Sequence, residues 1–156
     1  MQDKISNDGL YSYDIYVANS INIVKENLIG CNQKETLIIL SLGEGEKKTP
    51  DSLLSFLKQI LAAINFDIEN DVFLLEVKQS NTIKVADLKK LAKIKYFINF
   101  GMPLHQLGFN LENDFLYRPF SLNGITFINA NSLNEIQKNV TLKKHFWNCL
   151  KATFLN

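Results

Sequence analysis

Apolar residues along the chain fall into short blocks that are separated by polar turns. Three of these blocks, at residues 36–42, 72–77 and 96–100, are almost continuously apolar and rich in branched and aromatic residues. Apolar runs of this length are typical of strands that are buried on both faces of a parallel sheet. We therefore predict three central strands at these positions.

A β-hairpin is predicted further along the chain. Residues 115–120 and 125–128 have strand-like composition, and the Asn123-Gly124 pair between them is a turn signal. Pro119 lacks the backbone N–H that a central strand must donate, so it favours a position at the edge of the sheet. The hairpin is therefore expected to form an edge of the sheet.

The first long helix is predicted to follow Thr49-Pro50-Asp51. Threonine suits a helix cap, proline suits the first helical position, and aspartate is favoured near the positive end of the helix dipole. Apolar residues then recur at helical spacing as far as Asn65, which is expected to end the helix. A second, basic amphipathic helix is predicted near residues 84–94.

Helix-capping signals are clear in the last quarter of the chain. Ser132 and Glu135 have the spacing of a capping box, in which serine accepts an amide hydrogen bond and glutamate reaches back. Asn139 is a second expected cap, and it predicts a last helix from about 140 to 153. A short helix is also predicted at residues 103–107.

The order of these elements predicts the fold class. Three strand–helix units in a row favour a mostly parallel sheet with helices on both faces. We therefore expect an α/β fold of the three-layer α/β/α type, with residues 1–156 in a single domain and the core at 36–154. The first 35 residues are ambiguous: a short helix is predicted over 19–29, whereas residues 10–17 alternate in the manner of a strand. Ligands of such folds usually bind beyond the carboxyl ends of the strands.

The composition is that of an ordinary folded protein. The 156 residues are 46% hydrophobic and 21% charged, which excludes collagen-like, disordered and disulfide-rich chains. No apolar run is long enough to cross a membrane, and the polar start lacks the core of a secretion signal, so a cytoplasmic location is expected. Cys31 and Cys149 are therefore expected to be reduced thiols, with Cys149 in the core.

Charge is unevenly distributed along the chain. The first 78 residues contain seven lysines and 12 acidic residues, whereas the last 78 contain ten basic and four acidic residues. A basic half can contact nucleic acid or an acidic partner, and it can equally be a solvated surface. The residues expected to make such a contact lie in two predicted helices: Lys89, Lys90, Lys93, Lys143 and Lys144.

A glycine-containing loop follows the first predicted strand. Segments between a strand and a helix bind phosphates in many α/β proteins. The sequence here matches neither common glycine-rich phosphate motif, and its glutamates would repel a phosphate. Two alternatives remain: Gly43, Glu44 and Gly45 bind a ligand, with Glu44 orienting a water molecule, or the loop is a plain connection.

The remaining candidate residues carry weaker signals. His105 follows a predicted strand, where it is either a base-binding or acid residue or an ordinary loop residue. His145 is predicted to be a surface residue, and the two histidines lack metal-ligand spacing, so neither a metal site nor a cofactor is expected. Trp147 can stack on a nucleic-acid base, although a tryptophan in an amphipathic helix more often packs against the core.

Three segments resemble the uracil-DNA glycosylase superfamily. Residues 37–61 contain a strand that ends in Gly-Glu and a leucine-rich helix, and residues 96–101 contain a strand that ends in glycine, as in that superfamily. Residues 132–150 keep four residues of its final motif: Asn139, Lys143, Trp147 and Leu150. The resemblance implies the glycosylase-like three-layer fold.

The departures from this superfamily concern its chemistry. The usual His-Pro-Ser triplet is replaced by Asn131-Ser132-Leu133, so the histidine that stabilises charge on the departing base is missing. The cysteines that hold a cluster in some branches are also missing. An active glycosylase is therefore not expected, and catalysis would have to use Glu44 and His105 on a flipped base.

A non-catalytic family, the psi subunits of bacterial DNA polymerase III, fits the residues better. Residues 119–124 match its Pro-x-Ser-Leu-x-Gly turn, and the resemblance extends over residues 36–154. The later matching positions are Leu133, Ile136, Asn139, Thr141, Lys143 and Trp147. This resemblance implies a non-enzymatic adaptor that binds a clamp-loader or chi-like subunit, with DNA as a further candidate partner and no membrane or metal. Residues 1–12 do not match the segment through which psi subunits contact the clamp loader.

Overall fold

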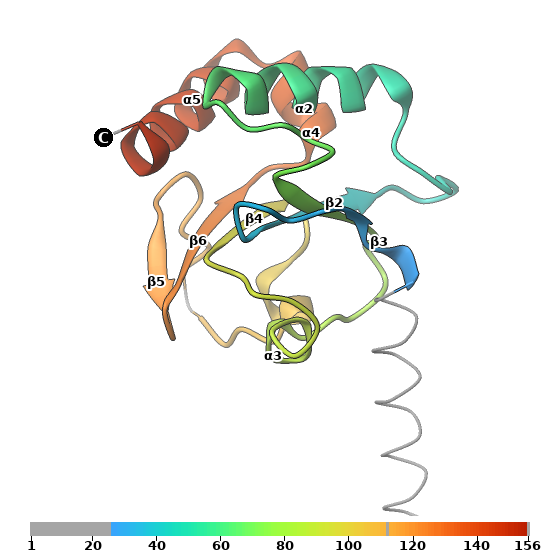
Figure 1. Cartoon of the computed structure of the whole chain (residues 1–156). Helices are drawn as coiled ribbons and strands as arrows, with labels where there is room; N and C mark the ends of the chain where they lie inside the picture. Colours follow the sequence, from blue (N-terminus) through green and yellow to red (C-terminus); the bar gives the residue numbers. More distant parts are fainter. Residues whose placement is uncertain (1–25, 112, 156) are drawn as a thin grey trace, which may run out of the picture.

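The centre of the fold is a six-stranded mixed β-sheet (Figure 1). The computed structural model of the chain describes residues 26–111 and 113–155. Within these residues the strands are β1 (Ile29–Gly30), β2 (Thr36–Leu42), β3 (Val72–Lys78), β4 (Tyr96–Phe100), β5 (Phe120–Leu122) and β6 (Ile125–Ala130). The spatial order is β1-β3-β2-β4-β6-β5; the four central strands are parallel, and the two edge strands are antiparallel to their neighbours. The predicted α/β class and mostly parallel sheet are confirmed.

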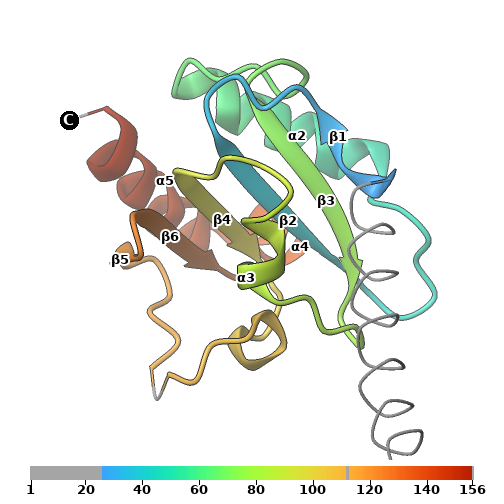
Figure 2. The same cartoon turned by 60° about the horizontal axis from the view of Figure 1, so that its bottom comes forward.

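The helices cover the two faces of the sheet unequally. The described helices are α2 (Asp51–Ala63), α3 (Val85–Leu88), the 3₁₀ helix η1 (Leu104–Leu107), α4 (Leu133–Lys138) and α5 (Val140–Phe154). Helices α2, α4 and α5 form a layer on one face, and the short α3 lies on the other face with η1 and loops (Figures 1 and 2). Helices do cover both faces, as predicted, but one face has only short ones.

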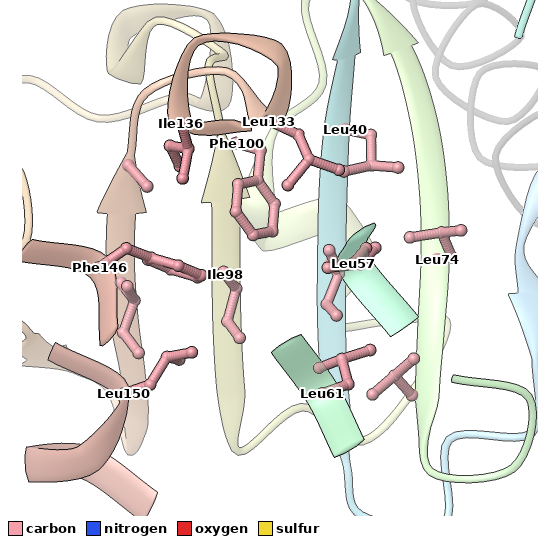
Figure 3. Packing of buried hydrophobic residues seen from close by; sticks show 14 of the residues in the cluster. Leu40, Leu57, Leu61, Leu74, Ile98, Phe100, Leu133, Ile136, Phe146 and Leu150 are labelled. Atoms are coloured by element: carbon pink, nitrogen blue, oxygen red, sulfur yellow. The ribbon is translucent and has the colours of Figure 1, made fainter. Parts of the chain in front are cut away.

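Two apolar cores follow from the alternation of side chains along the strands. In β2, Ile38 and Leu40 point to the layer of α2, α4 and α5, whereas Leu37 and Ile39 point to the layer of α3. All four side chains are at most 2% exposed. Figure 3 shows the first core, where Leu57 of α2 and other helical side chains pack on the strands. Because β2 is buried on both faces, its sequence is an almost continuous apolar run.

The hairpin is confirmed, but its first strand is shorter than predicted. Asn123 and Gly124 have φ values of 52° and 80°, as the turn type favoured in tight hairpins requires. Strand β5 begins only at Phe120, because Phe115 and Tyr117 have φ values of 53° and 59°, which are incompatible with extended backbone. The predicted strand over 115–120 is therefore wrong for most of its length.

Two predicted helix features are also wrong. The helix predicted over 84–94 contains only the four residues of α3, after which Lys90 and Leu91 donate to the carbonyls three residues back instead of four. This 3₁₀-type bonding tightens the chain into turns. Helix α2 begins after Pro50, and the Thr49 side chain does not cap it.

The other capping predictions are confirmed. The Glu135 amide donates to Ser132 Oγ at 3.3 Å, and the Ser132 hydroxyl donates to Glu135 Oε1 at 3.2 Å. Asn139 Oδ1 accepts from the Thr141 and Leu142 amides at 2.9 and 3.2 Å. These caps fix where α4 and α5 begin, and α5 covers the predicted range of 140–153.

Most of the helix predicted over 19–29 lies outside the described residues. Residues 26 and 27 are helical, and Ile29 instead belongs to β1. In the part of the chain that the structure describes, no helix has both the length and the apolar character needed to span a bilayer.

Candidate functional site

An open cleft of about 440 Å³ lies at the carboxyl ends of β4 and β6. Its walls come from the segments that follow these strands and from the loop before β5. The lining residues that carry polar groups are His105, Asn110, Asn113, Asp114, Asn129, Asn131, Ser132 and Glu135. The position agrees with the expectation that ligands of α/β folds bind beyond the carboxyl ends of parallel strands.

Two buried asparagines lie where β4 and β6 reach this cleft. Asn99 and Asn129 are register partners, and they are 2% and 6% exposed. Asn99 Nδ2 donates to Asn129 Oδ1 at 2.6 Å and to the Met102 carbonyl at 2.8 Å, while the Met102 amide donates to Asn99 Oδ1 at 3.1 Å. Asn129 Nδ2 donates to the Asp114 carbonyl at 2.7 Å. The pair thus anchors the backbone of both cleft walls.

A second hydrogen-bonded group connects the cleft to α4 and α5. The Tyr117 hydroxyl donates to Asn131 Oδ1 at 2.6 Å, and Asn131 Nδ2 donates to Glu135 Oε2 at 3.3 Å. The ring of Tyr117 lies 5.9 Å from that of His145. Burial raises the pKa of Tyr117 above its usual value, so the phenol stays protonated and can donate. The polar groups here are largely occupied by one another.

The rim of the cleft exposes apolar side chains. Leu111 and Leu116, which line the cleft, are 40% and 38% exposed. His105 is exposed at the same cleft, and Asp114 contributes a carboxylate. The cleft therefore combines apolar rim residues with acidic and amide groups.

A smaller cavity of about 130 Å³ lies beside the end of β2. Ser41 Oγ and Thr49 Oγ1 are buried and have no hydrogen-bond partner among the described residues. Both residues line this cavity, together with Leu40, Gly43, Glu46, Leu53, Gln79, Ser132, Leu133 and Asn134. Thr49 is only 4% exposed, and its backbone amide donates to Glu76 Oε2 at 3.2 Å. The cavity is therefore bordered by two residues whose buried hydroxyls lack a hydrogen-bond partner, which is uncommon in folded proteins.

The loop singled out from the sequence lies at a different hollow from His105. Glu44 and Gly45 are exposed and line an open hollow with Lys78, while Gly43 lines both this hollow and the smaller cavity. Glu44 lines this hollow, whereas His105 lines the open cleft. The two residues proposed for the alternative catalytic function thus border different hollows.

The two groups of candidate lysines lie on opposite sides of the sheet. Lys89, Lys90 and Lys93 follow α3, whereas Lys143 and Lys144 belong to α5 (Figure 1). Lys90 pairs with the neighbouring Asp87 at 3.9 Å. A single flat ligand cannot contact both groups at once.

The sequence reading missed the residues that build the cleft. Asn99 and Asn129 were available as a signal, because Phe-Ile-Asn occurs in both strands, at residues 97–99 and 127–129. A polar residue at the same place in two buried strands indicates a cross-strand hydrogen bond. Tyr117 and Thr49 had no comparable signal because they lie in loops, and Ser41 is a single polar residue near the end of β2.

Within residues 26–111 and 113–155, no group of three or more His, Cys, Asp or Glu side chains is placed to hold a metal ion. Cys31 is exposed and Cys149 is buried, as predicted for the latter. Burial raises the pKa of the Cys149 thiol to about 11, which keeps it protonated and unreactive near neutral pH.

Comparison with protein-family models finds no match to this sequence, and comparison with curated proteins finds none either.

Proposed function

We propose that the protein is a non-enzymatic adaptor of the uracil-DNA glycosylase-like fold, similar to the psi subunit of DNA polymerase III and acting in the cytoplasm. The observation that carries this proposal is the arrangement of polar and apolar groups in the cleft at the carboxyl ends of β4 and β6. Its buried polar groups hydrogen-bond to one another and to the backbone, while Leu111 and Leu116 stay exposed at its rim. Exposed apolar residues around a concave surface are a feature of protein-docking sites.

The distribution of titratable groups supports an adaptor over an enzyme. A general acid or base must lie within hydrogen-bonding reach of the group that it serves. His105 lines the cleft and Glu44 lines the hollow after β2, so neither of these two hollows contains both residues. Asn131 and Ser132, at the place of the glycosylase triplet, are engaged by Tyr117 and Glu135 and supply no positive charge. The partner that the resemblance suggests is a clamp-loader or chi-like subunit.

A binding experiment with purified clamp-loader and chi-like subunits from the same organism tests the proposal. We expect a stable complex by size-exclusion chromatography and calorimetry, which the Leu111→Glu/Leu116→Glu variant weakens at least about tenfold because it places charges at the apolar rim. Leu122→Glu is the matched control. Leu122 is 41% exposed, but it pairs with Ile125 at the opposite end of β6 from the cleft. No complex with any of these subunits would overturn the proposal.

A second candidate function, nucleobase binding with weak or lost base-excision activity, is favoured by the smaller cavity. Ser41 and Thr49 line it, and their buried hydroxyls have no hydrogen-bond partner among the described residues. A ligand that gained access to these hydroxyls would satisfy them. Uracil titration followed by NMR tests this function, with Thr49→Val as the variant that keeps the side-chain shape but removes the hydroxyl. Binding that disappears in Thr49→Val, or uracil excision from DNA that disappears in Glu44→Ala, would favour this function over the adaptor.

A further inference from the structure

Helix α5 carries a stripe of basic and aromatic residues that do not line the cleft. The helix contains three lysines and one histidine but no acidic residue. Phe146, Cys149 and Leu150 are the buried residues that hold it on the sheet. Its three lysines are all exposed, so the side chains of its outer surface contribute positive charge and no negative charge.

The side chains of the stripe share one flank of α5. Val140, Lys144, Trp147 and Lys151 follow one another at steps of four, three and four residues, and Lys143 lies four residues before Trp147. This spacing places the five residues along the same side of a helix. Eleven residues separate the first and the last, so the stripe is about 16 Å long. Val140 is 80% exposed, and Trp147 is only partly buried against the core. The stripe is thus accessible along its length.

Two lysines of the stripe each lie near an aromatic ring. Lys143 Nζ lies 5.6 Å from the ring centroid of Phe56 in α2, and Lys151 Nζ lies 5.8 Å from that of Trp147. The contact with Phe56 also shows that the stripe is on the flank of α5 that faces α2. Phe56 is partly buried, like Trp147. Each ring is therefore accompanied by a positive charge within reach of the same ligand.

We propose that this stripe, defined by Val140, Lys143, Lys144, Trp147 and Lys151, binds single-stranded nucleic acid. Proteins bind single strands by combining lysines that contact the phosphates with aromatic rings on which bases stack. Duplex DNA keeps its base faces stacked internally and cannot use the rings. An acidic peptide would satisfy the lysines but would leave the flat aromatic surfaces without a matching group. The charges and the rings together therefore favour a single strand over both.

This proposal is independent of the adaptor function, because the stripe and the cleft share no residue. It also distinguishes the two lysine groups. Lys89, Lys90 and Lys93 border a shallow hollow with aliphatic Leu91 and Ile94, and no aromatic residue lines it. They carry a similar charge without a stacking surface, so they provide a matched control on the other side of the sheet.

Fluorescence anisotropy with a labelled 15-nucleotide oligothymidylate at low salt tests the proposal. The variants Lys143→Ala/Lys144→Ala/Lys151→Ala and Lys89→Ala/Lys90→Ala/Lys93→Ala remove the same number of charges from exposed positions, and circular dichroism checks that both are folded. We expect the first to lose at least about tenfold in affinity and to reduce the slope of log affinity against log salt by about 2, since each phosphate contact contributes about 0.7 for single strands. The second should lose less than about threefold.

The only tryptophan of the chain supplies a second measurement. Stacking predicts that oligothymidylate quenches Trp147 fluorescence in the parent, and that Trp147→Leu weakens binding about fivefold or more whereas Trp147→Phe largely preserves it. Equal losses in the two lysine variants, unchanged Trp147 fluorescence on binding, or tighter binding to a 15-residue oligoglutamate than to oligothymidylate would each overturn the proposal.

Discussion

Asn99 and Asn129 lie side by side in adjacent parallel strands and are joined by a buried side-chain hydrogen bond of 2.6 Å. Each also holds a segment that forms a wall of the cleft, through Met102 and Asp114. The identical tripeptides at 97–99 and 127–129 are paired residue for residue, so that an Asn pair follows an Ile pair and a Phe pair. Two buried side chains of the sheet therefore fix the position of both walls of the cleft.

Removal of the Asn99 amide is expected to destabilise the protein strongly. Asn99→Ala leaves the Met102 amide and Asn129 Oδ1 buried without their partners. Each unsatisfied buried group costs about 1–3 kcal/mol, so the free energy of unfolding should fall by about 2–4 kcal/mol. Urea denaturation monitored by circular dichroism measures this change. Asn148→Ala on the exposed side of α5 is the control and should change stability by less than about 0.5 kcal/mol. Equal stability of the two variants would contradict the structural role of the pair.

Gly101 marks the point where β4 turns into the cleft, and we expect it to tolerate no side chain. It has a φ of 90°, and a Cβ there would collide with Ser41 Oγ and lie 3.0 Å from Ser132 Cα. Backbone strain and overpacking together should cost Gly101→Ala about 2–4 kcal/mol of stability. Gly45→Ala is a matched control: its φ is 81°, but a Cβ there would meet nothing within 4 Å, so only the strain of about 1 kcal/mol is expected. The difference between their denaturation midpoints isolates the close packing at Gly101.

The central fold was predictable because its signals are local. Strands buried on both faces are apolar at most positions, and the segments 36–42, 72–77 and 96–100 all formed strands. Helices were placed well where a side chain caps them, as at Ser132 and Asn139. Amphipathic spacing alone was insufficient near residues 84–94, where the chain must reach β4 soon after α3 and tightens into turns instead.

The candidate site was less predictable, because it depends on contacts between distant segments. Glu44 and His105 were chosen by residue type and by their positions after strands, but the sequence does not say which loops share a hollow. The side chain of Tyr117 hydrogen-bonds to Asn131 from a segment in which Phe115 and Tyr117 have positive φ values. Neither phenylalanine nor tyrosine predicts such a backbone conformation. The repeated Phe-Ile-Asn was the one readable signal of the cleft, since its meaning depends only on strand register.

The cap of α5 gives a prediction about the helix that carries the basic stripe. Asn139 Oδ1 satisfies two amides at the start of the helix, so Asn139→Ala should lower the free energy of unfolding by about 1 kcal/mol. Asn139→Asp keeps the acceptor and adds a charge that the helix dipole favours, so it should match or slightly exceed the parent in stability. Urea denaturation of the three proteins checks this order, and an alanine variant as stable as the parent would show that the cap contributes nothing.

The buried Cys149 thiol predicts a loss of stability at alkaline pH. Its pKa is raised from 9.0 to about 11 by burial, so the unfolded chain releases the thiol proton before the folded one does. The unfolded state therefore binds fewer protons above pH 9, and the free energy of unfolding must fall as the pH rises from there to about 11. Near pH 10.5 the contribution amounts to about 2 kcal/mol relative to pH 8.

Urea midpoints measured from pH 8 to 10.5 under reducing conditions test this prediction by comparison with Cys149→Ala. The variant is expected to be less stable than the parent at pH 8, because it loses buried volume, but its stability should decline less steeply. A residual decline is expected from Tyr117, whose pKa is raised in the same direction and which remains in the variant. If the urea midpoints of the two proteins declined in parallel with pH, the thiol would not be buried in solution. Helix α5 would then not pack on the sheet through Cys149.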